Sequence, residues 1–196
     1  IIFNFALAIG LLAFTTAQAQ NMSRYITLTV KNGAKIKLRL NAAADGTPVK
    51  IKSGSNEQIV TVNKAQGTFN YTATDTIMTV YGDVTIFHCG YTKANITDLD
   101  PSHNTGLLEL NCSSDSIRSL DVTKNTSLIL LDCYSTRLST LDVTKNTELA
   151  KLFCSSNKLS TLDVTKNTKL TKLRCFLANL NTLDVTKNTQ LVELNC

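Results

Sequence analysis

The chain has 196 residues, 43% of them hydrophobic and 18% charged, a composition that excludes an intrinsically disordered protein and fits one domain or two small ones. The net charge of +5 comes from dispersed lysines, with no basic block and no stacking aromatic residues between them. This distribution argues against a nucleic-acid-binding protein.

Residues 1–19 are predicted to be a signal peptide. They read IIFNFALAIGLLAFTTAQA, an apolar run followed by Ala17-Gln18-Ala19, which is the small-x-small pattern found before a cleavage site. The run is shorter than the roughly 20 residues of a membrane-spanning helix, although a membrane anchor is the alternative interpretation. We therefore expect an exported protein, secreted or at the cell surface, that begins at Gln20 and is not inserted in a membrane after cleavage.

Residues 20–83 are predicted to form a small all-β N-terminal domain. Segments such as YITLTV, AKIKLRL and EQIVTV alternate polar and apolar residues, and turn signals such as Asn32-Gly33 and Asp45-Gly46 separate them. This pattern is typical of an antiparallel β-sandwich-like unit. The segment TVYGDVTIFHC continues into the C-terminal part of the chain without a linker, so we expect this domain also to cap the open N-terminal edge of that part.

Residues 84–196 are built from a repeat of 21 residues. The segment LDVTKNT recurs at this step, beginning at Leu120, Leu141, Leu162 and Leu183. Cysteines recur with the same step from Cys112 to Cys196. Repetition at a fixed period predicts a solenoid in which each turn stacks on its neighbours. The sequence stops in the middle of a turn, and we expect the solenoid to be incomplete at that end.

One turn reads L-x-x-L-x-C-x-x-N-x-L-x-x-L-D-V-T-K-N-T-x, which resembles the leucine-rich repeat over roughly residues 84–196. More narrowly, the wording LxCxxNxLxxLDVTKNT resembles the surface leucine-rich repeat proteins of Bacteroidetes, which are similar in outline to internalins. The resemblance implies a mainly β or α/β fold, a right-handed solenoid with parallel strands on its concave face and ligand binding there. It implies no catalytic residues and no cofactor.

The row of cysteines has four interpretations. In the strand L-x-C the leucine and the cysteine point to the same side, so each cysteine takes a core position of the repeat. Disulfide bonds are a second interpretation, but stacked rungs lie about 4.8 Å apart whereas bonded Cβ atoms lie about 3.8 Å apart. A line of single cysteines does not converge as zinc ligands do. A nucleophilic cysteine needs a base, and the chain has only two histidines, His88 and His103.

Asparagine, aspartate and lysine also recur once per turn. The asparagine of the repeat signature is kept at Asn157, whereas the other turns have Asp115, Thr136 and Ala178. A second candidate ladder, at the opposite corner of the coil, consists of Asn125, Asn146, Asn167 and Asn188. We interpret the aspartates and lysines of LDVTKNT as serving structure and solubility. A calcium site is the alternative, but the aspartates lack D-x-D spacing.

Side chains that point outward from the predicted strands vary from turn to turn and form three rows. The first row is Ile86, Glu109, Leu130, Lys151, Lys172 and Glu193; the second row is His88, Asn111, Asp132, Phe153, Arg174 and Asn195; the third row is Ser113, Tyr134, Ser155 and Phe176. Exposed aromatic residues beside arginine are enriched in recognition hot spots. The predicted ligand-binding residues are Glu109, Asp132, Tyr134, Lys151, Phe153, Lys172, Arg174 and Phe176. The alternative is a surface that faces water and binds no partner.

These patterns predict a non-enzymatic, exported, monomeric binding protein. Its partner would be a protein or a glycan, with adhesion to host or other cells as one use. The alternative is a structural spacer that presents a further C-terminal domain or anchor. A hydrolase is the third class, and it would need a catalytic module beyond residue 196.

Overall fold

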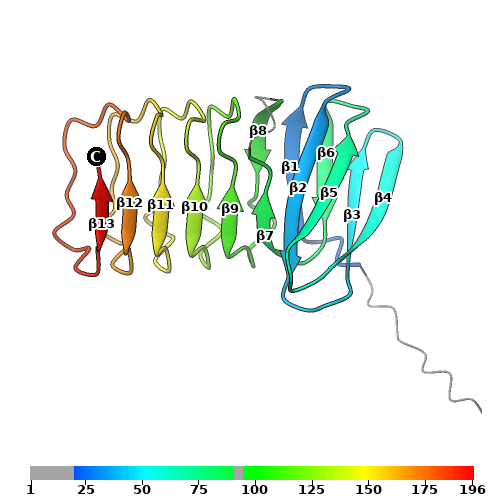
Figure 1. The fold of residues 1–196 in the computed structure, drawn as a ribbon, viewed down its shortest axis with the longest axis horizontal. Coiled ribbons are helices and arrows are strands. Elements are labelled where there is room, and N and C mark those ends of the chain that lie inside the picture. Colours follow the sequence, from blue (N-terminus) through cyan, green and yellow to red (C-terminus); the bar gives the residue numbers. More distant parts are fainter. Residues whose placement is uncertain (1–19, 91–94) are drawn as a thin grey trace, which may run out of the picture.

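A computed structural model describes residues 20–90 and 95–196, and these ranges contain strands and no helix (Figure 1). The predicted signal peptide lies outside the described residues. One sheet has five strands in the order β4-β3-β6-β1-β8, and the other has eight in the order β13-β12-β11-β10-β9-β7-β2-β5. The predicted fold class, a repeat solenoid preceded by antiparallel strands, is confirmed. Within the described ranges, no helix is long and apolar enough to span a membrane.

The N-terminal part consists of six antiparallel strands. They are β1 (Tyr25–Val30), β2 (Lys35–Ala42), β3 (Thr47–Ser53), β4 (Asn56–Val62), β5 (Gly67–Thr72) and β6 (Ile77–Tyr81). The alternation in the sequence decides which side of each strand is buried. On β2, Ile36 and Leu38 are buried, while Lys37 and Arg39 are exposed on the other face of the sheet. The polar side of β2 therefore belongs to the outer surface of the eight-stranded sheet.

Two strands join the N-terminal part to the solenoid. Strand β7 (Val84–His88) pairs antiparallel with β2 and parallel with β9, while β8 (Ile96–Asp100) pairs antiparallel with β1. Strand β2 thus covers the edge that β7 would otherwise expose to solvent. Phe87 on β7 is fully buried at this junction, between Leu40 on one side and Leu110 on the other. One hydrophobic core runs through both parts.

The solenoid places one short parallel strand in each coil. These are β9 (Glu109–Asn111), β10 (Leu130–Asp132), β11 (Lys151–Phe153), β12 (Lys172–Arg174) and β13 (Glu193–Asn195). Each residue pairs with the residue 21 positions later, as Leu131 does with Leu152. Figure 1 shows these strands side by side, in a row that leads from the N-terminal sheets to the C-terminus. One 21-residue period of the sequence therefore corresponds to one coil of the solenoid.

The asparagine ladder predicted at the opposite corner is confirmed. Asn146 Nδ2 donates to the carbonyl oxygens of Val122 and Asn125, both at 2.9 Å, and so bonds its own coil to the preceding one. Asn125, Asn167 and Asn188 repeat these two contacts in their own coils. Buried backbone carbonyls need such partners, because no water reaches them.

Asn157 bonds two coils at the other corner. Its Oδ1 accepts the backbone N–H groups of Thr136, Arg137 and Leu138 at 2.9–3.3 Å. Its Nδ2 donates to the carbonyl oxygens of Cys133 and Cys154 at 2.8 and 3.0 Å. This one side chain, which is 5% exposed, thus satisfies five buried or half-buried backbone groups.

The aspartates of LDVTKNT close a local turn. Asp142 Oδ1 accepts the backbone N–H of Thr144 at 2.9 Å and its hydroxyl at 2.7 Å, and the other three coils repeat the pattern. The threonine hydroxyl and N–H hold the pKa of each of these carboxyls below its ordinary value. This arrangement supports the interpretation of the aspartate row as structural.

The turn aspartates should make the fold sensitive to acid. Because their folded-state pKa lies below the unfolded value of 3.8, the stability they contribute is present above that pH and is lost as the pH falls through the folded-state pKa. We expect the urea midpoint to fall between pH 5 and pH 3. Exchanging Asp121, Asp142, Asp163 and Asp184 for asparagine, which keeps the acceptor, should flatten this dependence. An equally steep dependence in that variant would contradict the assignment, and Asp98→Asn serves as a single-site control.

Candidate binding surface on the strand face

The outward side chains of the solenoid lie on one surface of the eight-stranded sheet, and the N-terminal part extends this surface. Pairing between strands aligns the second row with a residue of β2, in the order Arg39, His88, Asn111, Asp132, Phe153, Arg174 and Asn195. Strands pack about 4.8 Å apart, so neighbours in this row are within side-chain reach of each other. The strand face is therefore longer than the repeat pattern alone indicates.

The structure brings the predicted aromatic residues and Arg174 together. The Arg174 guanidinium carbon lies 5.1 Å from the centre of the Phe153 ring, a cation–π geometry. The rings of Tyr134 and Phe176 lie 6.4 Å apart and are tilted by 43°. Tyr134 and Arg174 are exposed, and the two phenylalanines are half-buried. We call Tyr134, Phe153, Arg174 and Phe176 the aromatic cluster.

Two of the predicted basic residues share a partner that was not among the predicted site residues. Glu193 on β13 forms ion pairs with Lys172, at 3.1 Å, and with Arg174. These contacts lower the pKa of Glu193, first through Arg174 and then through Lys172. Lys151, by contrast, is exposed and has no ion pair with any described carboxylate. Three cations at this end of the surface, Lys151, Lys172 and Arg174, thus share one carboxylate, so the end stays net positive beside its aromatic residues.

The two predicted acidic residues, Glu109 and Asp132, lie on β9 and β10, in the middle of the strand face. Asp132 Oδ2 accepts a hydrogen bond from Asn111 Nδ2 at 2.9 Å, and its Oδ1 accepts the backbone N–H of Tyr134 at 3.1 Å. Burial raises the pKa of Asp132, and these hydrogen bonds only partly offset that effect. Glu109 lies 3.5 Å from His88 Nε2. Glu109 is thus three strands away from Phe176 and is not in contact with the aromatic cluster.

The third row differs from the prediction at its two serines. Ser113 and Ser155 were expected on the exposed surface, but both are buried. Ser155 lies on the rung between Tyr134 and Phe176, whose rings meet across that rung. A small residue between two large ones leaves room for the rings to lean over it. Of this row, only the two aromatic residues therefore belong to the surface.

The cysteine row is part of the core, as predicted for five of its members. Cys89, Cys112, Cys133, Cys154 and Cys175 are at most 2% exposed, and all six cysteines are free thiols. Burial raises the pKa of Cys154 to about 12 and that of Cys175 to about 11, and burial also raises the pKa of the other three. A raised pKa disfavours the thiolate, which is the nucleophile and the metal ligand. Cys196 is exposed, since no described coil covers β13.

Thiol labelling of the native protein checks this arrangement. We expect one of the six cysteines, Cys196, to react rapidly with an aromatic disulfide reagent, and the other five to react only after unfolding in urea. Rapid reaction of two or more thiols in the native state would contradict the burial of the row. A Cys196→Ser variant, which should show almost no rapid reaction, identifies the reactive group.

No protein-family model and no curated protein matches this chain. Among solved structures, it is similar to the functional domain of InlJ from Listeria monocytogenes, a structure described as including a cysteine ladder, with 35% sequence identity and a TM-score of 0.47 over 57% of this chain and 29% of that one. It is also similar to the internalin InlF from Listeria monocytogenes, with 22% identity and a TM-score of 0.40 over 50% of this chain and 36% of that one. The chain thus spans about a third of the length of these two structures.

The structure shows directly what one repeat of the sequence forms. Its sequence period of 21 residues is one coil, each coil carries one parallel strand, and buried asparagines bond successive coils at the corners. Groups of three or more histidine, cysteine, aspartate or glutamate side chains arranged to hold a metal ion are absent from the described residues. The described part of this chain is therefore a solenoid of 21-residue coils with one parallel strand in each, joined to an antiparallel β-sheet unit.

Proposed function

We propose that this chain is a non-enzymatic binding protein that holds a protein partner, or a glycan, on its strand face. The observation that carries the proposal is the aromatic cluster, in which one ring contact, Tyr134 with Phe176, and one cation–π contact, Arg174 with Phe153, lie on three successive coils. Tyrosine, phenylalanine and arginine in such clusters supply much of the binding energy at interfaces. Aromatic side chains also lose little conformational entropy on binding.

The rigid backbone under the cluster supports the same proposal. Strands β10, β11 and β12 are fixed by ladder hydrogen bonds and by the asparagine contacts between coils, so the cluster is held in place before a partner arrives. A surface that is already ordered loses less entropy on binding than a mobile loop does. We also propose export and a role in adhesion, on the basis of the signal-peptide pattern at residues 1–19.

Cell-binding measurements test the proposal. The fluorescently labelled chain would be titrated onto intact mammalian cells, onto intact bacteria and onto an array of immobilised glycans. A triple variant, Phe153→Ala with Arg174→Ala and Phe176→Ala, is expected to weaken any saturable binding by tenfold or more. The matched control replaces three exposed lysines outside the strand rows, Lys124, Lys145 and Lys166, with alanine and should bind as the parent chain does.

The binding curves of these proteins distinguish a binding protein from a structural spacer. Saturable binding that the triple variant loses and the lysine variant keeps supports recognition through the aromatic cluster. Equal binding by all three proteins would place recognition elsewhere. Absence of saturable binding on every surface would favour the structural spacer. Circular dichroism and the urea midpoint of each variant check that the fold is intact, because two of the three exchanged side chains, Phe153 and Phe176, are half-buried.

A further inference from the structure

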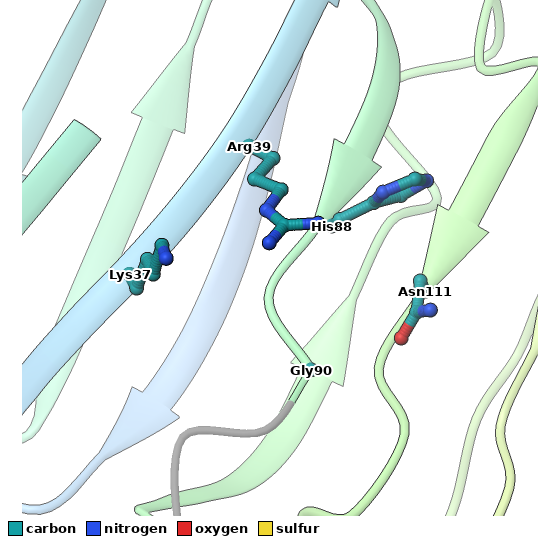
Figure 2. Close-up of a pocket in the computed structure, with 5 residues that line it drawn as sticks. All are labelled: Lys37, Arg39, His88, Gly90 and Asn111. Atoms are coloured by element: carbon teal, nitrogen blue, oxygen red, sulfur yellow. The ribbon is translucent and has the colours of Figure 1, made fainter. Parts of the chain in front are cut away.

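A pocket at the junction of the N-terminal sheets and the solenoid is lined by cationic and neutral polar groups. It has a volume of about 280 Å³ and is lined by Lys37, Arg39, His88, Gly90 and Asn111. Figure 2 shows Lys37 and Arg39 projecting from β2 on one side, with His88 and Asn111 on the other. The pocket is slightly smaller than the about 300–1,000 Å³ of sites that enclose a drug-sized ligand. Its size suits one charged group and the unit that carries it.

The two cations of this pocket have no carboxylate partner. Neither Lys37 nor Arg39 forms an ion pair with any carboxylate in the described residues, although ion pairs involve several other cations of the chain. Two carboxylates lie next to lining residues, Glu109 against His88 and Asp132 against Asn111, but neither is among the described residues that line the pocket. Burial lowers the pKa of His88, which favours its neutral form. The described lining residues therefore carry two positive charges and no negative one.

The opposite wall holds the side-chain amide of Asn111 in a fixed orientation. Asn111 Oδ1 accepts the backbone N–H of Ser113 at 3.0 Å and its hydroxyl at 2.8 Å, which sets the direction of the amide. Nδ2 then donates one N–H to Asp132 Oδ2 and retains a second. A Cβ atom on Gly90 would lie 2.4 Å from Asn111 Oδ1, so only glycine allows the chain to run this close to the amide.

We infer that this pocket binds a tetrahedral oxyanion, a sulfate or phosphate group. Its two positive charges match a dianion, because the guanidinium fork of Arg39 donates to two oxygens at once and Lys37 supplies the second charge. A planar carboxylate has only two oxygens and one charge, and it would leave one cation unmatched. The group belongs to a sulfate ester or a phosphate ester on a larger molecule. The inference does not rest on the proposed function, because the pocket shares no residue with the aromatic cluster.

The two histidines allow a direct test by NMR. Sulfate and phosphate would be titrated separately into the chain at constant ionic strength, and the imidazole signals of His88 and His103 followed against pH. A bound anion stabilises the imidazolium form, so each anion should shift the His88 signals saturably and raise the His88 pKa by about 0.5. The charged groups that face His88 are Arg39, Glu109 and Asp132. His103 stacks on Tyr25 away from the pocket and serves as the internal control.

Paired variants assign the response to this pocket. Lys37→Gln with Arg39→Gln should weaken sulfate binding about tenfold or more. This variant should still fold, and its ligand-free His88 pKa should rise, because the charge of Arg39 lowers it. The control, Arg118→Gln with Lys158→Gln, removes two cations from a different pocket and should bind as the parent does.

Three results would overturn the assignment. The first is an equal response of His88 and His103 to the anions. The second is unchanged sulfate affinity in the Lys37 and Arg39 double variant. The third is an affinity for acetate as high as that for sulfate and phosphate, which would show that the pocket does not prefer tetrahedral oxyanions. A saturable response of His88 alone, stronger for sulfate or phosphate than for acetate and lost in the double variant, supports it.

Discussion

Replacing Asn157 with alanine is expected to lower the free energy of unfolding by about 3–4 kcal/mol. The side chain accepts from three backbone N–H groups, on Thr136, Arg137 and Leu138, and donates to two carbonyls. Alanine leaves these groups in a buried corner that water reaches poorly, and each unsatisfied group costs about 1–3 kcal/mol. Relaxation of the loop and partial hydration recover some of the total. Urea unfolding at pH 7, followed by circular dichroism, measures the loss.

Two further substitutions serve as comparisons for Asn157→Ala. Asn157→Asp keeps the acceptor for the three N–H groups but loses the donor to the two carbonyls, so its loss should differ from that of alanine. Asn181→Ala removes an exposed asparagine of the same solenoid and should cost less than about 0.5 kcal/mol. A loss below about 1 kcal/mol for Asn157→Ala would mean that the five contacts contribute little beyond what water supplies.

The second large effect is expected for Phe87→Ala, at about 3–5 kcal/mol. Phe87 is the largest of the fully buried side chains, and it lies on β7 between strands of the N-terminal part and of the solenoid. Removing the ring leaves a cavity where the two parts meet. Because one sheet and one core cross this junction, we also expect both the parent chain and the variant to unfold in a single transition.

The unfolding curve of the Phe87 variant also tests the domain boundary predicted at residue 83. Two separated transitions, one for the N-terminal strands and one for the solenoid, would contradict the single cooperative unit and favour two independent domains. Phe69→Ala is the matched control. Phe69 lies on the outer strand β5 and is only partly buried, so its loss should be clearly smaller. Tryptophan is absent from the chain, so circular dichroism and tyrosine fluorescence are the suitable probes.

The coil was predictable because its information is local and repeated. Leucine and cysteine two positions apart must face the same side of a strand, so the burial of Leu152 and Cys154 follows from the spacing. The same holds for the corner ladder, since Asn146 and Asn167 recur at one coil position and buried carbonyls need donors. One turn of sequence, repeated, thus predicts nearly the whole solenoid.

The pairing of β2 with β7 was not predictable from the alternation in either segment. Arg39 and His88 are partners in the sheet but lie 49 positions apart in the chain, and alternation says which side is buried without saying which strand is the neighbour. That Lys37 and Arg39 form a cationic end of the strand face is therefore visible only in the structure. Sequence reasoning placed Lys37 and Arg39 in a separate domain, and so the pocket that they share with Asn111 was missed.

Side-chain directions on the surface were a second limit. Nothing in the third row indicates that the rings of Tyr134 and Phe176 meet over Ser155 and cover it. Likewise, Glu193 was recognised as an outward residue, but its ion pairs with Lys172 and Arg174 depend on rotamers that no periodicity encodes. Backbone position was thus accessible from sequence, and the charge balance of the surface was not.

The asparagine contacts between coils have a consequence for how such a protein can change its size. Each donor reaches back to carbonyls 21 and 24 residues earlier, as in Asn167 with Asn146 and Val143. Duplicating or excising one whole period leaves every such offset intact and moves the far end by one rung, about 4.8 Å. An insertion of any other length within a coil shifts the donors off their carbonyls. The solenoid can therefore be lengthened or shortened by whole repeats, whereas insertions of other lengths within a coil should destabilise it.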